Sequence, residues 1–166
     1  FEHTNEEYKN YNFLLEFELK ARYQDEYSWF VSPKGQAVVV KYPEFATQKE
    51  MKWIIDQFVA VENAVYAKNY NTYKDLIDVE SFAKMYMIQE LTKNLDSAST
   101  SYYIHNDQDT GKLAASPVWD YDWSMGSYYK YKPIYGGSNS YTMDNVEQWF
   151  VKNKPMNTEP YNTPDG

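Results

Sequence analysis

Apolar and polar side chains alternate along the first part of the chain in the manner of β-strands. Between residues 13 and 19 every second side chain is apolar, and this period of two predicts a half-buried strand. Residues 27–31 and 37–40 predict two further strands, and the Pro and Gly of residues 33–35 supply a tight turn between them. We therefore expect a small antiparallel meander that ends near residue 43.

The middle of the chain changes to the period of an amphipathic α-helix. Thr47 and Glu50 match a capping box, in which the hydroxyl and the carboxylate each satisfy a backbone amide at the helix start. The helix can run to about Ala67, and Asp78 is placed to cap a second helix. The apolar face of the first helix is predicted to contain Met51, Ile54, Ile55, Phe58 and Val65. That of the second is predicted to contain Val79, Phe82, Ala83, Tyr86 and Leu91.

The last part of the chain returns to strand patterns. Residues 101–105 and 112–118 flank a polar turn at residues 106–111, which predicts a β-hairpin. A short helix is expected near residues 144–151, and the prolines after residue 154 indicate a tail or linker. Strands and helices in separate stretches predict the fold class α+β.

Composition places the chain among folded globular proteins. Its 166 residues suffice for one domain, and 43% hydrophobic with 24% charged residues is close to the average of such proteins. The 24 acidic residues outnumber the 16 basic ones, which gives a net charge of -8. Such a surface repels phosphate backbones and anionic membranes, so we expect neither nucleic-acid nor membrane binding. No apolar run of the sequence reaches the roughly 18–20 residues that span a bilayer.

The absence of cysteine excludes disulfide bonds, thiolate metal sites and cysteine nucleophiles. Tyrosine is abundant, with 18 residues, while histidine is scarce, with 2. An acidic chain rich in Tyr and Asn suits a secreted bacterial protein better than a cytosolic enzyme, so we expect an extracellular or cell-surface location. Because the first residue is Phe1 rather than Met, we also expect an excised or processed piece of a longer protein.

Two acidic residues near the end of the second predicted helix are candidates for chemistry. Glu90 shares a helical stripe with Tyr86 and Met87, so it should face inward or toward the floor of a cleft, where a carboxylate needs a partner. A structural Glu bound to backbone amides or to a lysine explains the same position. Asp96 follows the helix end, where the helix dipole disfavours an anion. A turn formed by Asn94 and Asp96 is the ordinary alternative.

The densest signal is a pair of carboxylates, Asp120 and Asp122, in an aromatic segment that follows a predicted strand. If the backbone turns here, both carboxylates can reach one hard cation. Magnesium accepts one or two carboxylates together with substrate phosphates, which indicates a nucleotide site. Alternatively, Asp122 caps the next segment while Trp119 and Trp123 fill the core. The sequence contains neither a P-loop nor a dinucleotide-binding glycine motif.

Taken together, these segments resemble the CotH kinase family, the spore-coat and secreted-protein kinases of bacteria. The resemblance covers about residues 13–126, and the succession of motifs in order makes it specific. The matching segments are residues 12–18, 40–44, 88–96, 101–104, 111–113 and 117–122, the last of which reads Pro-Val-Trp-Asp-Tyr-Asp.

The resemblance implies an atypical protein-kinase-like fold, in which a small antiparallel meander is followed by a helical lobe whose β-hairpin carries the metal-binding Asp. It also implies transfer of the γ-phosphate of ATP to Ser or Thr of a secreted or coat protein, with Mg²⁺ or Mn²⁺. Asp96 matches the catalytic-loop Asp that accepts or orients the hydroxyl proton. Asp120 matches the Asp that binds the metal, and Asp122 assists it. Ser101 stands where a kinase usually places a metal-binding Asn.

The resemblance also divides the chain. Residues 1–153 would form a partial kinase domain, with residues 1–43 as the remnant of the small lobe and residues 44–153 as the large lobe. Residues 154–166 would be a tail or linker. The family's phosphate-cradling segments and nucleotide-pairing lysine lie upstream of the matching region, and none of Lys20, Lys34 and Lys41 stands in the motif of that nucleotide-pairing lysine. We therefore expect a fragment of a larger domain or a reduced relative that has lost catalysis.

The expected ligands and partners follow from the same resemblance. The nucleotide should contact Trp119 and Glu90, beside the metal-binding residues. The protein partner should be a secreted or surface protein that carries the accepting Ser or Thr. The acidic, aromatic composition also fits secreted domains that accompany carbohydrate-active proteins, so a carbohydrate-associated multidomain assembly is expected.

Two other functions stay open. A non-catalytic module that binds carbohydrate or protein would use the tyrosines between residues 128 and 141, since aromatic faces stack on sugars and anchor interfaces. The ordinary interpretation of those tyrosines is a packed loop. A nucleotide-sugar transferase would use residues 120–122 as a metal-binding D-x-D, although the sequence lacks the doubly wound α/β pattern of such enzymes.

Overall fold

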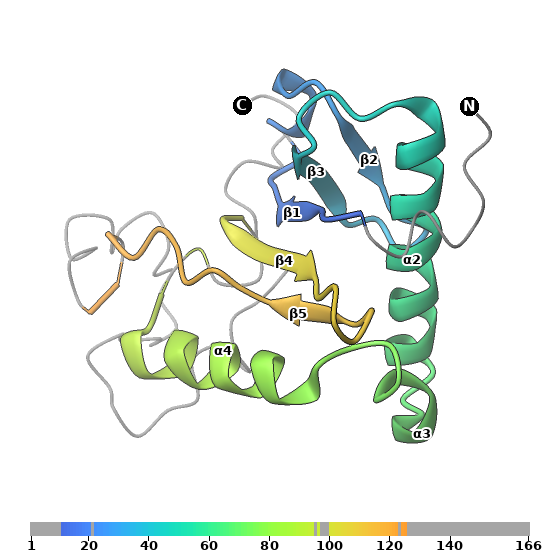
Figure 1. The fold of residues 1–166 in the computed structure, drawn as a ribbon. Coiled ribbons are helices and arrows are strands. Elements are labelled where there is room, and N and C mark those ends of the chain that lie inside the picture. Colours follow the sequence, from blue (N-terminus) through green and yellow to red (C-terminus); the bar gives the residue numbers. More distant parts are fainter. Residues whose placement is uncertain (1–10, 21, 95, 97–99, 123, 126–166) are drawn as a thin grey trace.

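The computed structural model of the chain describes residues 11–20, 22–94, 96, 100–122 and 124–125 (Figure 1). Its elements are β1 (Leu14–Phe17), η1 (Tyr23–Asp25), β2 (Trp29–Val31), β3 (Ala37–Tyr42), α2 (Gln48–Tyr66), α3 (Tyr70–Tyr73), α4 (Val79–Thr92), β4 (Tyr102–Asn106) and β5 (Leu113–Ala115). The predicted α+β class is confirmed. The predicted helix near residues 144–151, the tail from residue 154 and the tyrosines between residues 128 and 141 lie outside the described residues.

The five strands form one antiparallel sheet in the order β2-β3-β1-β4-β5. β1 is central, and its Leu15 lies opposite Val40 of β3 on one side and Ile104 of β4 on the other. The predicted strands and their antiparallel pairing are confirmed, but the order of a meander is wrong because β3 lies between β1 and β2. The connection from β1 to β2 contains η1 rather than a tight turn, so these two strands are not a hairpin.

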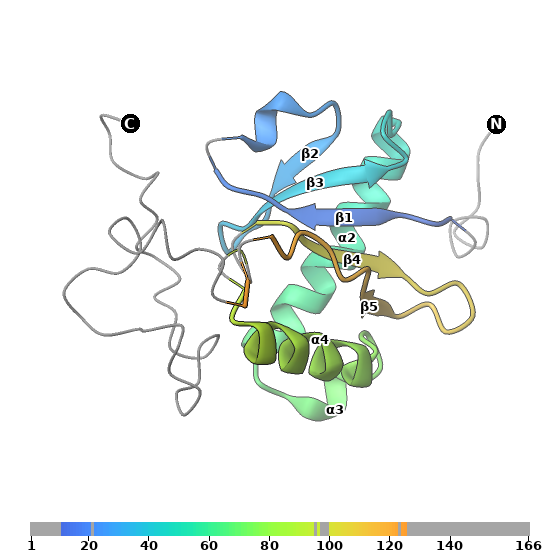
Figure 2. The same cartoon turned by 90° about the vertical axis from the view of Figure 1, so that its left-hand side faces the viewer.

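Helix α2 lies behind the sheet and α4 runs along its β5 edge (Figure 2). The capping box of α2 is confirmed: the Glu50 amide donates to Thr47 Oγ1 over 3.3 Å, and the Thr47 amide donates to Glu50 Oε2 over 2.7 Å. The predicted apolar face is correct except at Val65, which is 44% exposed. At this end α2 contacts α3, and Ala64 is buried there instead.

Helix α4 begins as predicted, since Asp78 Oδ1 accepts hydrogen bonds from the amides of Glu80 and Ser81. Its predicted packing face is wrong at Ala83 and Leu91, which are both exposed, Leu91 to 81%. The buried face runs instead through Met85 and Gln89. Apolar side chains occur all round this helix, so periodicity alone could not select the face that packs on β5.

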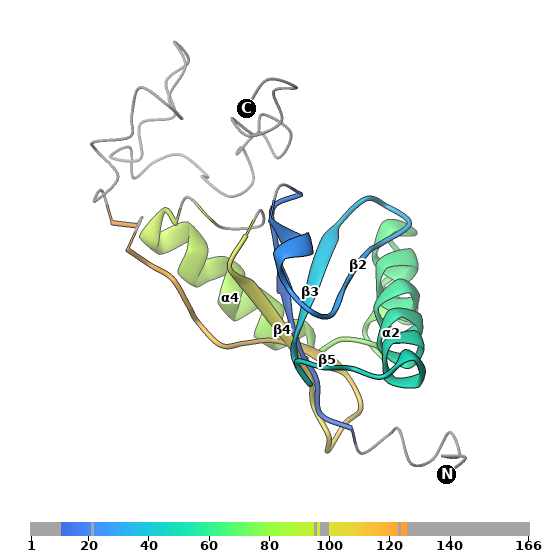
Figure 3. The same ribbon diagram turned by 90° about the horizontal axis from the view of Figure 1, so that it is seen from above.

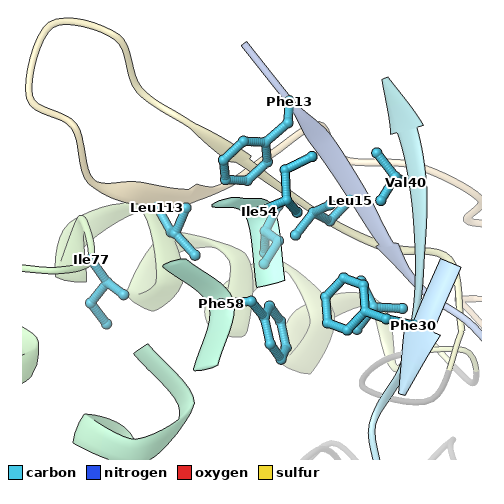
Figure 4. Packing of buried hydrophobic residues seen from close by; sticks show 10 residues of the cluster. Phe13, Leu15, Phe30, Val40, Ile54, Phe58, Ile77 and Leu113 are labelled. Carbon is cyan, nitrogen blue, oxygen red and sulfur yellow. The ribbon is translucent and has the colours of Figure 1, made fainter. Parts of the chain in front are cut away.

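The hydrophobic core fills the space between α2 and one face of the sheet (Figure 4). The Phe58 ring of α2 meets Phe17 and Phe30 edge-on, with ring centroids 6.0 and 5.4 Å apart. The buried members of this core are Phe13, Leu15, Phe30, Val38, Val40, Ile54, Phe58, Ile77, Ile104 and Leu113. Because side chains alternate along a strand, Glu16 lies on the opposite face of the sheet from its neighbours Leu15 and Phe17.

β5 is shorter than the predicted strand and ends at Ala115. The next residues are Ser116 and Pro117, and proline has no amide hydrogen with which to continue a ladder. From there the chain runs along the side of the sheet away from α2 (Figure 3). This path brings residues 119–122 toward the C-terminal end of α4, where the candidate site lies.

Candidate functional site

Three carboxylates meet where the chain leaves α4 and where it leaves β5. Asp96, Asp120 and Asp122 each offer one oxygen, and these oxygens all lie within 4.8 Å of one another. Asp96 is half-buried, while Asp120 and Asp122 are exposed. Carboxylate oxygens at such separations are suited to a shared hard cation, because the cation offsets the repulsion between the anions.

A turned backbone explains how Asp120 and Asp122 reach the same point. Asp120 has φ +59°, in the left-handed region that Asp and Asn tolerate better than most residues. The backbone is therefore turned at Asp120 rather than extended. Ser101 has φ +52°, also left-handed, and its Oγ donates to Asp120 Oδ2 over 3.0 Å. Unusual backbone conformations of this kind concentrate at functional sites.

The side chain of Asn94 holds the two aspartate segments together. It is 2% exposed. Its Oδ1 accepts a hydrogen bond from the Asp96 amide over 3.1 Å, and its Nδ2 donates to the Asp120 carbonyl over 3.3 Å. A further backbone bond joins the Met125 amide to the Thr92 carbonyl over 2.7 Å. The end of α4 is thus bonded on both sides of the Asp120–Asp122 turn.

Thr100 attaches the loop that carries Asp96 to the chain following β1. It is buried, and its amide donates to the Asp96 carbonyl over 3.1 Å. Its hydroxyl donates to Glu18 Oε1 over 2.7 Å. Arg22 Nη2 in turn donates to Thr100 Oγ1 over 3.3 Å and to Glu18 Oε1 over 3.0 Å. The sheet and the aspartate loop are therefore linked by polar contacts that span much of the sequence.

A second polar cluster lies on the same face of the sheet as the site. Lys41 Nζ lies 3.5 Å from Glu16 Oε2 and 2.8 Å from Glu26 Oε1. Burial raises the pKa of Glu16 above its usual value, and the hydrogen bond from Tyr103 and the charge of Lys41 offset only part of that rise. Burial lowers the pKa of Lys41, but its hydrogen bond to Glu26 and the charge of Glu16 outweigh burial and leave the pKa raised.

Tyr103 connects this cluster with the aromatic segment before Asp120. Burial, and then the negative charge of Glu16, raise the pKa of the Tyr103 hydroxyl. The Tyr103 ring meets the Trp119 ring edge-on, with centroids 6.2 Å apart. Trp119 is 58% exposed, so its indole offers an open surface next to the carboxylates rather than filling the core.

The structure brings together four of the six predicted site residues. Asp96, Asp120 and Asp122 form the carboxylate group, and Ser101 is bonded to it. Trp119 is adjacent to Asp120 in sequence, whereas Glu90 is not a member of the carboxylate group. Glu90 faces inward as expected, with a side chain 12% exposed, and forms an ion pair with Lys93 over 3.0 Å. This pair accounts for the burial of Glu90 without a ligand, so its contact with a nucleotide stays a prediction.

The turn predicted at Asn94 and Asp96 is confirmed by the hydrogen bond between them, but sequence reasoning missed the other residues that hold the site in place. Asn94 had a detectable signal, because an Asn two residues before an Asp is typical of a side-chain-bonded turn. Glu18, Arg22 and Thr100 had none, since the contacts of Arg22 and Glu18 with Thr100 join residues 78 and 82 positions apart. Pairs so distant in sequence leave no periodic pattern.

Comparison with protein families places the whole of this architecture in a known group. The family model described as CotH kinase protein matches residues 1–163. The match extends on both sides of the region whose motifs carried the resemblance. No curated protein and no solved structure matches the chain significantly. Among the described residues, none of the helices is long and apolar enough to cross a membrane.

Proposed function

The chain belongs to the CotH kinase family, and on that premise we propose that it binds a divalent cation and ATP at Asp96, Asp120 and Asp122. The reaction proposed is transfer of the γ-phosphate to a Ser or Thr hydroxyl of another protein. The observation that supports this most strongly is the meeting of three carboxylates, from two separate segments, within 4.8 Å. A kinase site needs such a group to hold cations against phosphate oxygens.

The donor set fits the cation that the family implies. Asp120 and Asp122 would hold Mg²⁺ or Mn²⁺, both of which accept carboxylate oxygens. Ser101 orients the Asp120 carboxylate through the hydrogen bond from its hydroxyl. The bound cation supplies charge neutralisation of the phosphates. The protein contributes a preorganised arrangement, because Asn94 and Ser101 hold the turn that aims both carboxylates at one point.

Asp96 is the proposed base. The acceptor hydroxyl oxygen forms a bond to the γ-phosphorus, and the bond from that phosphorus to the bridging oxygen breaks, so that ADP leaves with the electron pair. The hydroxyl proton passes to a carboxylate oxygen of Asp96. The hydrogen bonds of the Asp96 backbone to Asn94 and Thr100 keep the carboxylate in place for this transfer.

The remaining assignments of the proposal are the nucleotide contact and the partner. The exposed Trp119 indole provides a face on which an adenine ring can stack. We propose a secreted or surface protein as the phosphate acceptor, an extracellular or cell-surface location, and membership of a carbohydrate-associated multidomain assembly. The alternative of a non-catalytic binding module rests on tyrosines outside the described residues, so no described contact favours it.

The proposal is tested by ATP labelled at the γ-phosphate. Hydrolysis and self-phosphorylation are measured with Mg²⁺ for the wild type, for Asp96→Asn and for Asp109→Asn. Asp109 is an exposed aspartate in the β4–β5 turn, so its substitution matches the change in charge without touching the site. Loss of a general base should lower the rate by about 100-fold or more. Label turnover by the wild type that Asp96→Asn leaves unchanged, or no turnover at all, would contradict the proposed reaction.

A further inference from the structure

Arg22 is the only arginine in the sequence, and it lies beside the candidate site. All other basic side chains except the two histidines are lysines. Arginine differs from lysine in presenting five N–H donors in a planar fork, which matches two oxygens of a phosphate at once. An exposed ion pair between residues close in sequence, such as that of Arg22 with Glu18, does not require the fork, because a lysine forms such a pair equally well.

The contacts of Arg22 leave much of its guanidinium open. Both of its hydrogen bonds within the described part of the chain go through Nη2, to Glu18 and to Thr100. The Arg22 side chain is 57% exposed, while that of Glu18 is 12% exposed. Glu18 and Thr100 thus fix Nη2, and among the described residues nothing accepts a hydrogen bond from Nη1 or Nε, each of which can be a donor to a ligand.

The position of Arg22 relates it to all parts of the carboxylate group. Thr100, which accepts its hydrogen bond, is bonded through its amide to Asp96. The next residue, Ser101, is bonded to Asp120. Arg22 is therefore connected to both aspartate segments through a single dipeptide.

The charges near the site suit Arg22 to neutralising a phosphate group. Two lysines of the contacts described above are already paired, Lys41 with Glu16 and Glu26, and Lys93 with Glu90. A nucleotide brings several negative charges, of which a cation on the aspartates neutralises a part. The open guanidinium is the group positioned to neutralise more of them.

We infer that Arg22 donates through Nη1 or Nε to a phosphate oxygen of the bound nucleotide, while the bonds of Nη2 to Glu18 and Thr100 hold the guanidinium in position. The inference rests on the proposed function and adds a phosphate-binding residue to it. It makes the chain following β1 part of the nucleotide site, in addition to the loops after α4 and β5.

Calorimetric titration of Mg·ATP into Arg22→Gln and Arg22→Lys tests the inference. A charge-assisted contact to phosphate predicts that Arg22→Gln weakens binding about tenfold or more. Arg22→Lys should recover only part of the loss, because lysine keeps the charge but has no second nitrogen that could reach the phosphate while the first bonds Glu18 and Thr100. Lys52→Gln is the matched control, since Lys52 forms an exposed ion pair with Asp56 at the same spacing on α2. That variant should bind Mg·ATP within about twofold of the wild type.

Titration of Mn²⁺ alone separates phosphate binding from support of the loop. If Arg22 contacts phosphate, Arg22→Gln binds Mn²⁺ like the wild type. An equal loss of Mn²⁺ and nucleotide affinity would mean that Arg22 only anchors Thr100, and would overturn the inference. Wild-type affinity of Arg22→Gln for Mg·ATP would overturn it too, while leaving the proposed function intact. A wild-type chain that binds no Mg·ATP would instead refute the proposed function, and the inference with it.

Discussion

Replacing Asn94 with alanine removes the side chain that holds both aspartate segments. The substitution deletes the bond from the Asp96 amide and the bond to the Asp120 carbonyl. Each buried hydrogen bond of this kind contributes about 1 kcal/mol, and the groups left without a partner cost somewhat more. We therefore expect the free energy of unfolding to fall by about 2–4 kcal/mol. A change of that size lowers the melting temperature of a domain of this length by roughly 5–15 °C.

The same substitution should weaken metal binding. Without Asn94 only the bond from Met125 to Thr92 ties the turn to the end of α4, so the carboxylates lose their fixed separation. Loss of a supporting contact of this type typically lowers metal affinity about 10–100-fold.

Thermal unfolding and Mn²⁺ titration of Asn94→Ala measure both effects, with Asn71→Ala as control because Asn71 is exposed on α3. The reasoning fails if Asn94→Ala is destabilised but binds Mn²⁺ like the wild type, or if its melting temperature is unchanged.

Two further predictions concern the sheet and its core. Phe58→Ala should lower the free energy of unfolding by about 3–5 kcal/mol, because the Phe58 ring packs edge-on against Phe17 and Phe30. Urea unfolding checks this, with Phe45→Ala as control because the Phe45 side chain is 68% exposed. An equal loss of unfolding free energy in the two variants would contradict the prediction. The pKa of Glu16 is raised above 4.5 by burial, so the folded state binds its proton more tightly than the unfolded state. Relative to Glu16→Gln, the contribution of Glu16 to the free energy of unfolding is therefore fully present at low pH. It is lost as the pH rises from about 4.5 through the raised pKa of the folded state. Urea unfolding of the wild type and of Glu16→Gln across this pH range should show a difference in unfolding free energy that changes with pH. A difference that stays constant would refute the prediction.

Helices α2 and α4 could be predicted because their signals are local. Thr47 and Glu50 lie three positions apart, and Asp78 bonds the amides two and three residues on, so a short window contains each cap. The strand order could not be predicted in this way. Whether β1 pairs with β2 or with β3 depends on contacts between distant segments, and the alternating pattern of β1 is satisfied by either neighbour.

The candidate site, too, could be predicted only where its signals are local in sequence. Asp96, Ser101, Asp120 and Asp122 could be identified because each stands in a recognisable motif. Their proximity depends on the left-handed turns at Ser101 and Asp120, which residue types alone do not specify. The Glu18–Thr100 bond spans 82 positions, and only the folded chain reveals that the segment after β1 supports the aspartate loop.

The central claim is that the three aspartates form a metal–nucleotide site, and calorimetric titration of Mg·ATP tests it most directly. Asp120→Asn is the informative variant, because Asn tolerates the left-handed backbone at φ +59° and the change removes only the charge. The account predicts Mg²⁺-dependent binding by the wild type and by Asp109→Asn, with binding by Asp120→Asn reduced about tenfold or more. Equal binding by all three proteins, or binding that is unaffected by removal of Mg²⁺, would contradict it.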